Sequence, residues 1–217
     1  MKLNLGCGSV RPEGWINTDS SLNAHLQRIP ILGKALSRFI KTVQYDNHNV
    51  VYMNLNRKWP FPSDSVDIVY ASHLFEHLSL KSADIFLKQA YRTLKKDGVM
   101  RLVVPDLYQI ARNYIELYDK AKDDADTTKD IMWAVNMHRE GQYGHPGVLK
   151  KIICEIQGYP HQHKYMYDAK SLTHQVKKYG FKNSRILCYG VSEYIPEIRD
   201  VEGKEESYLS VYLEVLK

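Results

Sequence analysis

The chain has 217 residues, 44% of them hydrophobic and 25% charged, and its net charge is +5. This length and composition predict one globular domain with a substantial core. The basic residues are scattered along the chain, which disfavours a nucleic-acid partner. No apolar run approaches the roughly 20 residues that a membrane span needs, and Met1 leads into a strand pattern rather than a signal peptide. The odd count of three cysteines argues against a disulfide framework, so we expect a cytoplasmic protein without a membrane span.

Short strands dominate the first part of the chain. The pattern of apolar and polar residues predicts strands at residues 2–5, 15–18, 50–55 and 66–71. Helical spacing of apolar residues predicts a helix at 31–43, between the second and third strands. The first strand stops at a Gly-Cys-Gly turn, and the second ends on Asp19. The connection between them is too short for a full helix, unlike that of an ordinary βαβ unit.

Helices and strands alternate through the rest of the chain. The clearest helix has an apolar stripe from Ala83 to Leu94, with Gly98 as its stop. A buried strand is predicted at 99–104, helices near 106, at 127–140 and at 168–179, and a strictly alternating strand at 209–215. The alternation indicates an α/β fold, a parallel sheet with helices on both faces and an antiparallel last strand.

The turn Gly6-Cys7-Gly8 is the first candidate binding element. Glycine lets the backbone turn sharply and lets a ligand approach without a Cβ in the way. The carboxyl end of a parallel strand is also where open α/β sheets bind ligands. A dinucleotide fingerprint needs a third glycine where this chain has Arg11, and no Gly-Lys-Ser/Thr follows, so neither NAD nor a P-loop nucleotide is favoured.

Asp19 is the second candidate. A carboxylate at the end of the second strand can accept two hydrogen bonds from a ribose diol. The alternative role is a turn cap ahead of Ser20 and Ser21.

The ordered series of motifs resembles the class I S-adenosylmethionine-dependent methyltransferases. More narrowly, it is similar to methyltransferase type 11-like proteins associated with bacterial surface-glycan biosynthesis. The series comprises Leu-Asn-Leu-Gly-Cys-Gly, Gly14-Trp15-Ile16-Asn17-x-Asp19, Trp59-Pro60-Phe61-Pro62, Glu76-His77-Leu78, Val103-Val104-Pro105-Asp106 and His163-Lys164-x-x-Tyr167-Asp168. It covers most of the chain.

The resemblance implies a fold, a cofactor and a set of binding residues. The fold is a Rossmann-like seven-stranded methyltransferase sheet of order 3-2-1-4-5-7-6, and the cofactor is S-adenosylmethionine. Gly6, Cys7 and Gly8 would wrap its methionine moiety, and Asp19 would hold its ribose. Asn54 and Leu55 stand where the family usually places an acidic residue against the adenine, and Ser72 would line the other side of the cofactor. An uncharged Asn54 makes a weaker adenine contact than a carboxylate.

Three residues are candidates for catalysis. Methyl transfer to a hydroxyl needs a base near the attacking oxygen, and His163, Asp106 and His73 are the candidates. His163 could instead be a loop histidine that binds the backbone, and Asp106 a helix N-cap. The groups His73, Glu76, His77 and His161, His163 lack a persuasive metal-ligand spacing, so no metal site is predicted.

Residues 1–217 are expected to form a single methyltransferase domain, with a helical and loop cover for the acceptor at about 106–167. The favoured function is methyl transfer to a hydroxyl of a small molecule or glycan precursor. The alternatives are N-methylation of an amino sugar or amine, and a non-catalytic cofactor-binding partner protein.

Overall fold

A computed structural model describes residues 1–20, 50–122, 126–128, 131, 162–202 and 209–217. These residues form a seven-stranded sheet of order β3-β2-β1-β4-β5-β7-β6, as the sequence predicts. The strands are β1 (Lys2–Leu5), β2 (Ile16–Asp19), β3 (Val50–Tyr52), β4 (Val66–Ser72), β5 (Leu94–Pro105), β6 (Lys182–Leu187) and β7 (Ser210–Leu216). The first five strands are parallel to one another, whereas β7 runs antiparallel to both β5 and β6. The expected antiparallel last strand is therefore confirmed.

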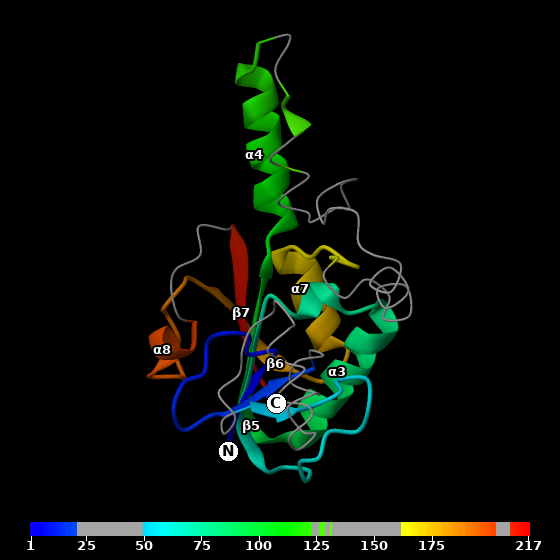
Figure 1. The fold of residues 1–217 in the computed structure, drawn as a ribbon, viewed down its shortest axis with the longest axis vertical. Helices are drawn as coiled ribbons and strands as arrows, with labels where there is room; N and C mark the ends of the chain where they lie inside the picture. The colour runs from blue at the N-terminus through cyan, green and yellow to red at the C-terminus, as the bar shows by residue number, and fades with distance from the viewer. Residues whose placement is uncertain (21–49, 123–125, 129–130, 132–161, 203–208) are drawn as a thin grey trace, which may run out of the picture.

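Helices lie on both faces of this sheet. The helices of the described residues are the short 3₁₀ helix η1 (Phe75–His77) and the α-helices α3 (Leu80–Thr93), α4 (Leu107–Lys120), α7 (Ala169–Lys177) and α8 (Ile198–Glu202). In Figure 1, α3 and α7 lie together on one side of the sheet and α8 on the other, while α4 extends away from the sheet. Within the described ranges, no helix is long and apolar enough to cross a membrane.

The alternation of side chains along the strands divides the core into two layers. One layer packs β1, β4 and β5 against α3 and α7, through residues such as Leu5, Met100, Phe86 and Leu172. The other layer packs Trp15, Ile68, Tyr70 and Val103 against Ile198 and Val201 of α8. Residues 6–15, which connect β1 to β2, form turns without a helix. Since that crossover supplies no helix for its face, α8 and the segment before it cover this side.

Two predicted boundaries are wrong, for local reasons. Helix α3 ends at Thr93 rather than near Gly98, because the carbonyls of Arg92 and Thr93 accept hydrogen bonds from the backbone N–H groups of Asp64 and Ser65. Leu94 then takes an extended conformation and begins β5.

The predicted strand at 50–55 stops at Tyr52, because Asn54 starts a turn. Its carbonyl accepts from Arg57 N, and its side-chain oxygen accepts from Asn56 N. The helix predicted at 31–43 and most of the one at 127–140 lie outside the described residues.

Candidate functional site

The glycine turn lies at the carboxyl end of β1, as predicted. Gly6 and Gly8 have φ of +64° and +51°, a region that residues with a Cβ rarely adopt. A Cβ on Gly6 would meet Leu74 at 3.0 Å, whereas a Cβ on Gly8 would meet no described atom within 4 Å. The turn therefore requires glycine at both positions for its backbone, and it leaves open space beside Gly8.

Asp19 lies against this turn. Its Oδ2 accepts a hydrogen bond from Gly8 N at 3.4 Å, and Cys7 N donates to the carbonyl of Thr18 at 3.0 Å. Burial, and then the negative charge of Asp19, raise the pKa of the Cys7 thiol to about 12. Cys7 is thus a neutral thiol at pH 7 and is not an activated nucleophile.

A cavity of about 110 Å³ opens beside the turn. Four of the residues predicted from the sequence line it together: Gly6, Cys7, Ser72 and His73. The backbone of His73 has φ of +48°, and its N–H donates to the carbonyl of Val103 at 2.9 Å, which fixes the chain at the end of β4. The ends of β1 and β4, far apart in sequence, therefore build one wall.

Asn54 and Leu55 are not among the residues that line this cavity. Leu55 is buried in the main core. The side-chain oxygen of Asn54 accepts from Asn56 N at 2.9 Å, and an amide oxygen can accept two hydrogen bonds.

The opposite wall of the cavity comes from the C-terminal part of the chain. It consists of Tyr189, Val201, Glu202 and Tyr212. The sequence analysis missed these residues, because no motif indicated that the segment between β6 and β7 would cover this end of the sheet.

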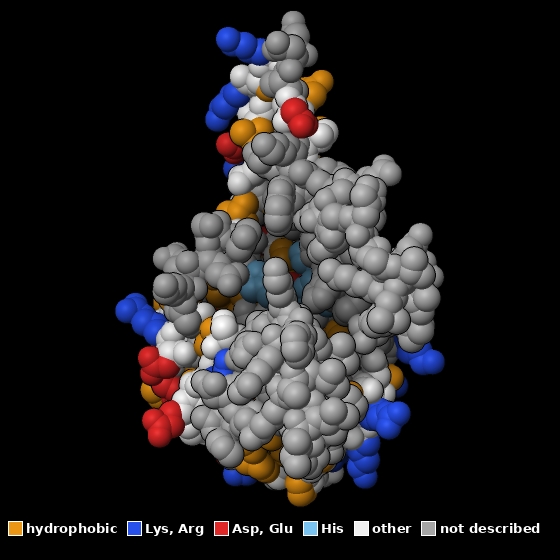
Figure 2. Space-filling view, viewed as in Figure 1, with side chains coloured by type: hydrophobic (Ala, Val, Ile, Leu, Met, Phe, Trp, Pro, Cys, Tyr) orange, Lys and Arg blue, Asp and Glu red, His pale blue; other side chains and the backbone are white. Residues whose placement is uncertain are grey.

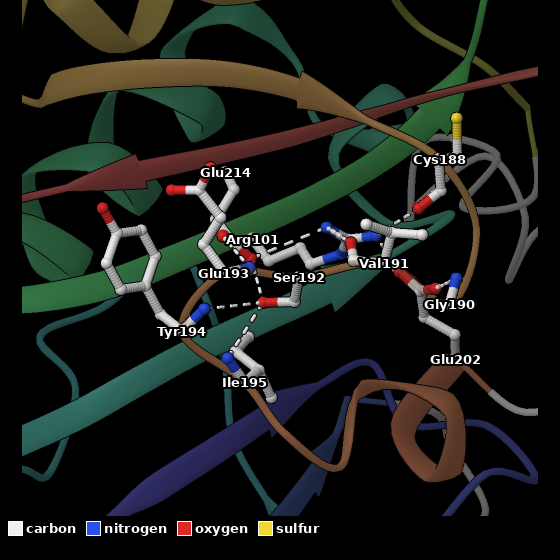
Figure 3. Close-up of polar contacts among 10 residues, drawn as sticks. All are labelled: Arg101, Cys188, Gly190, Val191, Ser192, Glu193, Tyr194, Ile195, Glu202 and Glu214. Carbon is white, nitrogen blue, oxygen red and sulfur yellow. Dashed lines mark hydrogen bonds and ion pairs between the residues drawn. The ribbon is translucent and has the colours of Figure 1, made fainter.

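A buried arginine holds that wall in place (Figure 3). Arg101 of β5 is fully buried. It donates through Nε to Glu202 at 2.7 Å, and its two terminal nitrogens donate to the carbonyls of Val191 and Cys188. The other carboxylate oxygen of Glu202 accepts from Gly190 N at 2.6 Å. Glu214 of β7 accepts from Ser192 Oγ, whose oxygen in turn accepts from Ile195 N. This network fixes the segment between β6 and α8 against the sheet. The sequence does contain a sign of this network, because Arg101 is the single charged residue in the apolar run 99–105.

A carboxylate and three histidines meet next to the cavity. Glu76, in η1, has a side chain that is only 1% exposed. Its Oε1 lies 3.5 Å from His73 Nδ1, 3.9 Å from His77 Nε2 and 3.9 Å from His163 Nε2. Figure 2 shows histidine side chains in a hollow at the centre of the molecule, below the projecting α4. We name Glu76, His73, His77 and His163 the Glu76 cluster.

Asp106 has the structural role that the sequence offered as its alternative. Its Oδ1 accepts from Tyr108 N at 3.0 Å, so it caps α4. Burial raises the pKa of this carboxyl above its ordinary value. Backbone contacts between Asp106 and Tyr167 bring the start of α4 next to the segment that carries His163.

The described residues fit S-adenosylmethionine. The open space beside Gly8 and the cavity beside Gly6 and Cys7 suit a ligand that approaches the backbone closely, and Asp19 provides a carboxylate at the same strand ends.

Comparisons with known proteins agree with this geometry. Residues 7–186 match the family described as a methyltransferase domain. A search of curated proteins found no match. Among solved structures, a SAM-dependent methyltransferase from Archaeoglobus fulgidus is similar, with a TM-score of 0.50 and 15% identity over 99% of this chain and 85% of the other. A SAM-dependent methyltransferase from Thermotoga maritima has a TM-score of 0.48 and 15% identity over 100% of this chain and 81% of the other. The chain belongs to the methyltransferase-domain family, and its cofactor is S-adenosylmethionine.

Proposed function

We propose that this enzyme transfers a methyl group to a hydroxyl of a small molecule or glycan precursor. One observation carries the proposal: His73 lines the cavity and lies 3.5 Å from the buried carboxylate of Glu76. An imidazole next to a carboxylate is a common general base. A hydroxyl is a poor nucleophile until it loses its proton, so an enzyme for such acceptors needs a base of this kind.

The cofactor supplies an electrophilic methyl group on a sulfonium, and the protein's task is alignment and proton removal. We assign Gly6, Cys7 and Gly8 to the methionine part of the cofactor and Asp19 to its ribose. Ser72 would line the cofactor on the β4 side. Asn54 would accept a hydrogen bond from the adenine amine through its side-chain oxygen, and Leu55 would support that turn from the core.

His73 is our first assignment for the base. The sequence alone puts His163 first, but His73 lines the cavity beside the glycine turn. His163 and Asp106 then belong to the acceptor side, where His163 faces Glu76 and Asp106 holds the start of α4.

We assign the acceptor cover to the segment 106–167, most of which lies outside the described residues, in one domain spanning residues 1–217. Tyr70, Tyr189 and Tyr212 line the cavity, and Tyr165 packs against Tyr167 with ring centroids 4.7 Å apart. Flat rings with a hydrogen-bonding end suit a sugar or another polar ring. The sequence resemblance to glycan-associated methyltransferases supports the same acceptor class. Cys7 and Cys188 are free thiols, which supports the reducing cytoplasm as the proposed location of the protein.

The test is methyl transfer from isotopically labelled S-adenosylmethionine to a panel of nucleotide sugars, small hydroxylated molecules and amines. Labelled product from hydroxyl acceptors supports the proposal. Product from amines alone would replace it with the N-methylation alternative. Cofactor binding without product from any acceptor class would favour a non-catalytic partner protein.

The same assay tests the base. His73→Ala should lower turnover by roughly 10²–10⁴, the usual contribution of a positioned base, while S-adenosylhomocysteine affinity changes only a few-fold. His174→Ala, an exposed histidine on α7, is the matched control and should keep full turnover. Near-normal turnover in the His73 variant would overturn the assignment.

A further inference from the structure

We propose that Glu76, His77 and His163 form a binding site for a divalent transition-metal ion. One ligand atom from each lies within 4.8 Å of the others. The spacing of these residues in the sequence gave no reason to expect a metal site, because the third ligand comes from a segment far along the chain. The fold alone brings the three together.

The carboxylate of Glu76 is the strongest indication that a cation binds here. Its side chain is 1% exposed, and among the described residues neither oxygen has a hydrogen-bond partner. Burying a carboxylate without hydrogen bonds or a paired positive charge is costly, so such groups in proteins are paired or bind metals. Among the residues that the structure describes, the rings of three histidines lie within 4 Å of this carboxylate.

The geometry of His77 fits a metal ligand. Its Nδ1 lies 3.1 Å from the carbonyl of Gln162, which can only accept, so Nδ1 carries the proton. In the neutral ring, Nε2 then presents a lone pair toward Glu76 Oε1, 3.9 Å away. Two electron-rich atoms that face each other attract a cation between them. A ring nitrogen bonded to a backbone carbonyl is also the usual outer contact of a metal-binding histidine.

The backbone holds the third ligand in place. The N–H groups of Lys164 and Tyr165 donate to the carbonyl of Glu76 at 2.8 and 3.2 Å. His163 precedes this pair, and its Nε2 lies 3.9 Å from Glu76 Oε1. The rings of His77 and His163 have centroids 4.8 Å apart. Phe75, the residue before Glu76, is fully buried and packs against Tyr167, which follows His163 in the chain, so both ligand segments are anchored in the core.

Two imidazoles and one carboxylate select the class of ion. Zn²⁺, Fe²⁺ and their neighbours accept this mixed set with one or more positions left open, whereas Mg²⁺ and Ca²⁺ prefer oxygen ligands. Metal bonds of about 2.0–2.2 Å put neighbouring ligand atoms about 3.4 Å apart in a tetrahedral site. The two distances of 3.9 Å from Glu76 Oε1 to the histidine nitrogens therefore need to shorten by about 0.5 Å each, and the two histidines, whose ligand atoms lie within 4.8 Å, need to approach each other as well.

The location suggests a role for the ion. His73, which lines the cavity, also lies 3.5 Å from Glu76, so an ion held by the carboxylate would be next to the cavity. An open coordination position there could bind an acceptor hydroxyl and lower its pKa. This role rests on the proposed function, whereas binding of the ion does not.

Binding is tested without any acceptor. The chelator-treated protein is titrated with Co²⁺, followed by its visible absorption bands, and with Zn²⁺ in competition. We expect one tightly bound ion per chain, displaced by Zn²⁺ and unaffected by a large excess of Mg²⁺. Glu76→Gln, which keeps the shape of the side chain, and His163→Ala should each weaken this binding by more than about 100-fold, since even outer contacts are worth 10–100-fold.

His174→Ala is the matched control and should retain the site, because this exposed histidine lies elsewhere on α7. Circular dichroism and thermal melting of each variant separate a lost ligand from a lost fold, and His77→Ala supplies a further ligand variant should Glu76→Gln not fold. Wild-type protein that binds no Co²⁺, or binds it equally well in folded ligand variants, would overturn the metal site. A bound ion combined with methyl transfer to amines only would overturn the proposed acceptor and leave the site standing.

Discussion

His163 Nε2 lies 3.9 Å from Glu76 Oε1, although α3, β5 and α4 separate the two residues in the chain. Backbone hydrogen bonds from Lys164 and Tyr165 to Glu76 enforce this proximity. The end of β4 and the segment before α7 are therefore coupled, and both the base and the acceptor cover of the proposed reaction depend on that coupling.

Removal of the Asp19 carboxylate should weaken cofactor binding without unfolding the sheet. Hydrogen bonds to a charged group contribute about 1.5–3 kcal/mol each, so Asp19→Ala should raise the Kd for S-adenosylhomocysteine on the order of 100-fold or more. Titration calorimetry measures this, with Asp119→Ala on the exposed face of α4 as the control. An unchanged Kd would assign Asp19 to the turn alone.

The two glycines of the turn should respond differently to alanine. Both variants force a Cβ into the left-handed region, at about 1–2 kcal/mol each. Gly6→Ala also brings the new Cβ to 3.0 Å from Leu74, so it should lose more stability than Gly8→Ala. Gly8→Ala should instead lose cofactor affinity, because its Cβ enters the open space assigned to the ligand. Urea unfolding and S-adenosylhomocysteine titration of both variants check this, and equal effects on both properties would contradict it.

Arg101 should be essential for the wall that it anchors. Arg101→Ala leaves the buried carboxylates of Glu202 and Glu214 without their cation, a loss of about 3–5 kcal/mol in the free energy of unfolding. Arg112→Ala is the matched control, since its ion pair with Glu116 is exposed and contributes about 0–1 kcal/mol. Similar midpoints of urea unfolding for the two variants would show that the network does not hold the wall.

The N-cap of α7 gives a prediction for pH. Asp168 accepts from Ser171 N at 2.7 Å, and this hydrogen bond lowers the pKa of the carboxyl below its ordinary value. Because the folded-state pKa is lowered, the charged cap stabilises the fold above the unfolded pKa of about 3.9, and this contribution is lost as the pH falls below it. Asp168→Ala should cost about 1 kcal/mol at pH 7, and less as the pH falls through 4 to 3. Thermal melting across this range measures the difference, and a constant difference would contradict the assignment.

The sequence by itself indicated a parallel α/β sheet with an antiparallel last strand, and a glycine turn followed by Asp19, while the family resemblance implied the order of the sheet and the cofactor class. These features are local or follow from a chain-long series of motifs: a strand that ends in Gly-x-Gly, a carboxylate that ends the next strand, and an alternating last strand. Hydrophobic periodicity and backbone chemistry act over a few residues, so a linear reading captures them.

Only the tertiary structure decided which polar groups face each other. His73 and His77 lie close to Glu76 in the sequence, but His163 does not. Its contact with Glu76 exists because the segment before α7 hydrogen-bonds to the backbone of Glu76. The pairing of Arg101 with Glu202 likewise depends on tertiary packing. It forms because α8 and the segment before it fold over the face of the sheet that lacks a crossover helix. A buried charge is paired through packing between segments that are distant in the chain, so the spacing of residues in the sequence does not predict which side chain lies next to it.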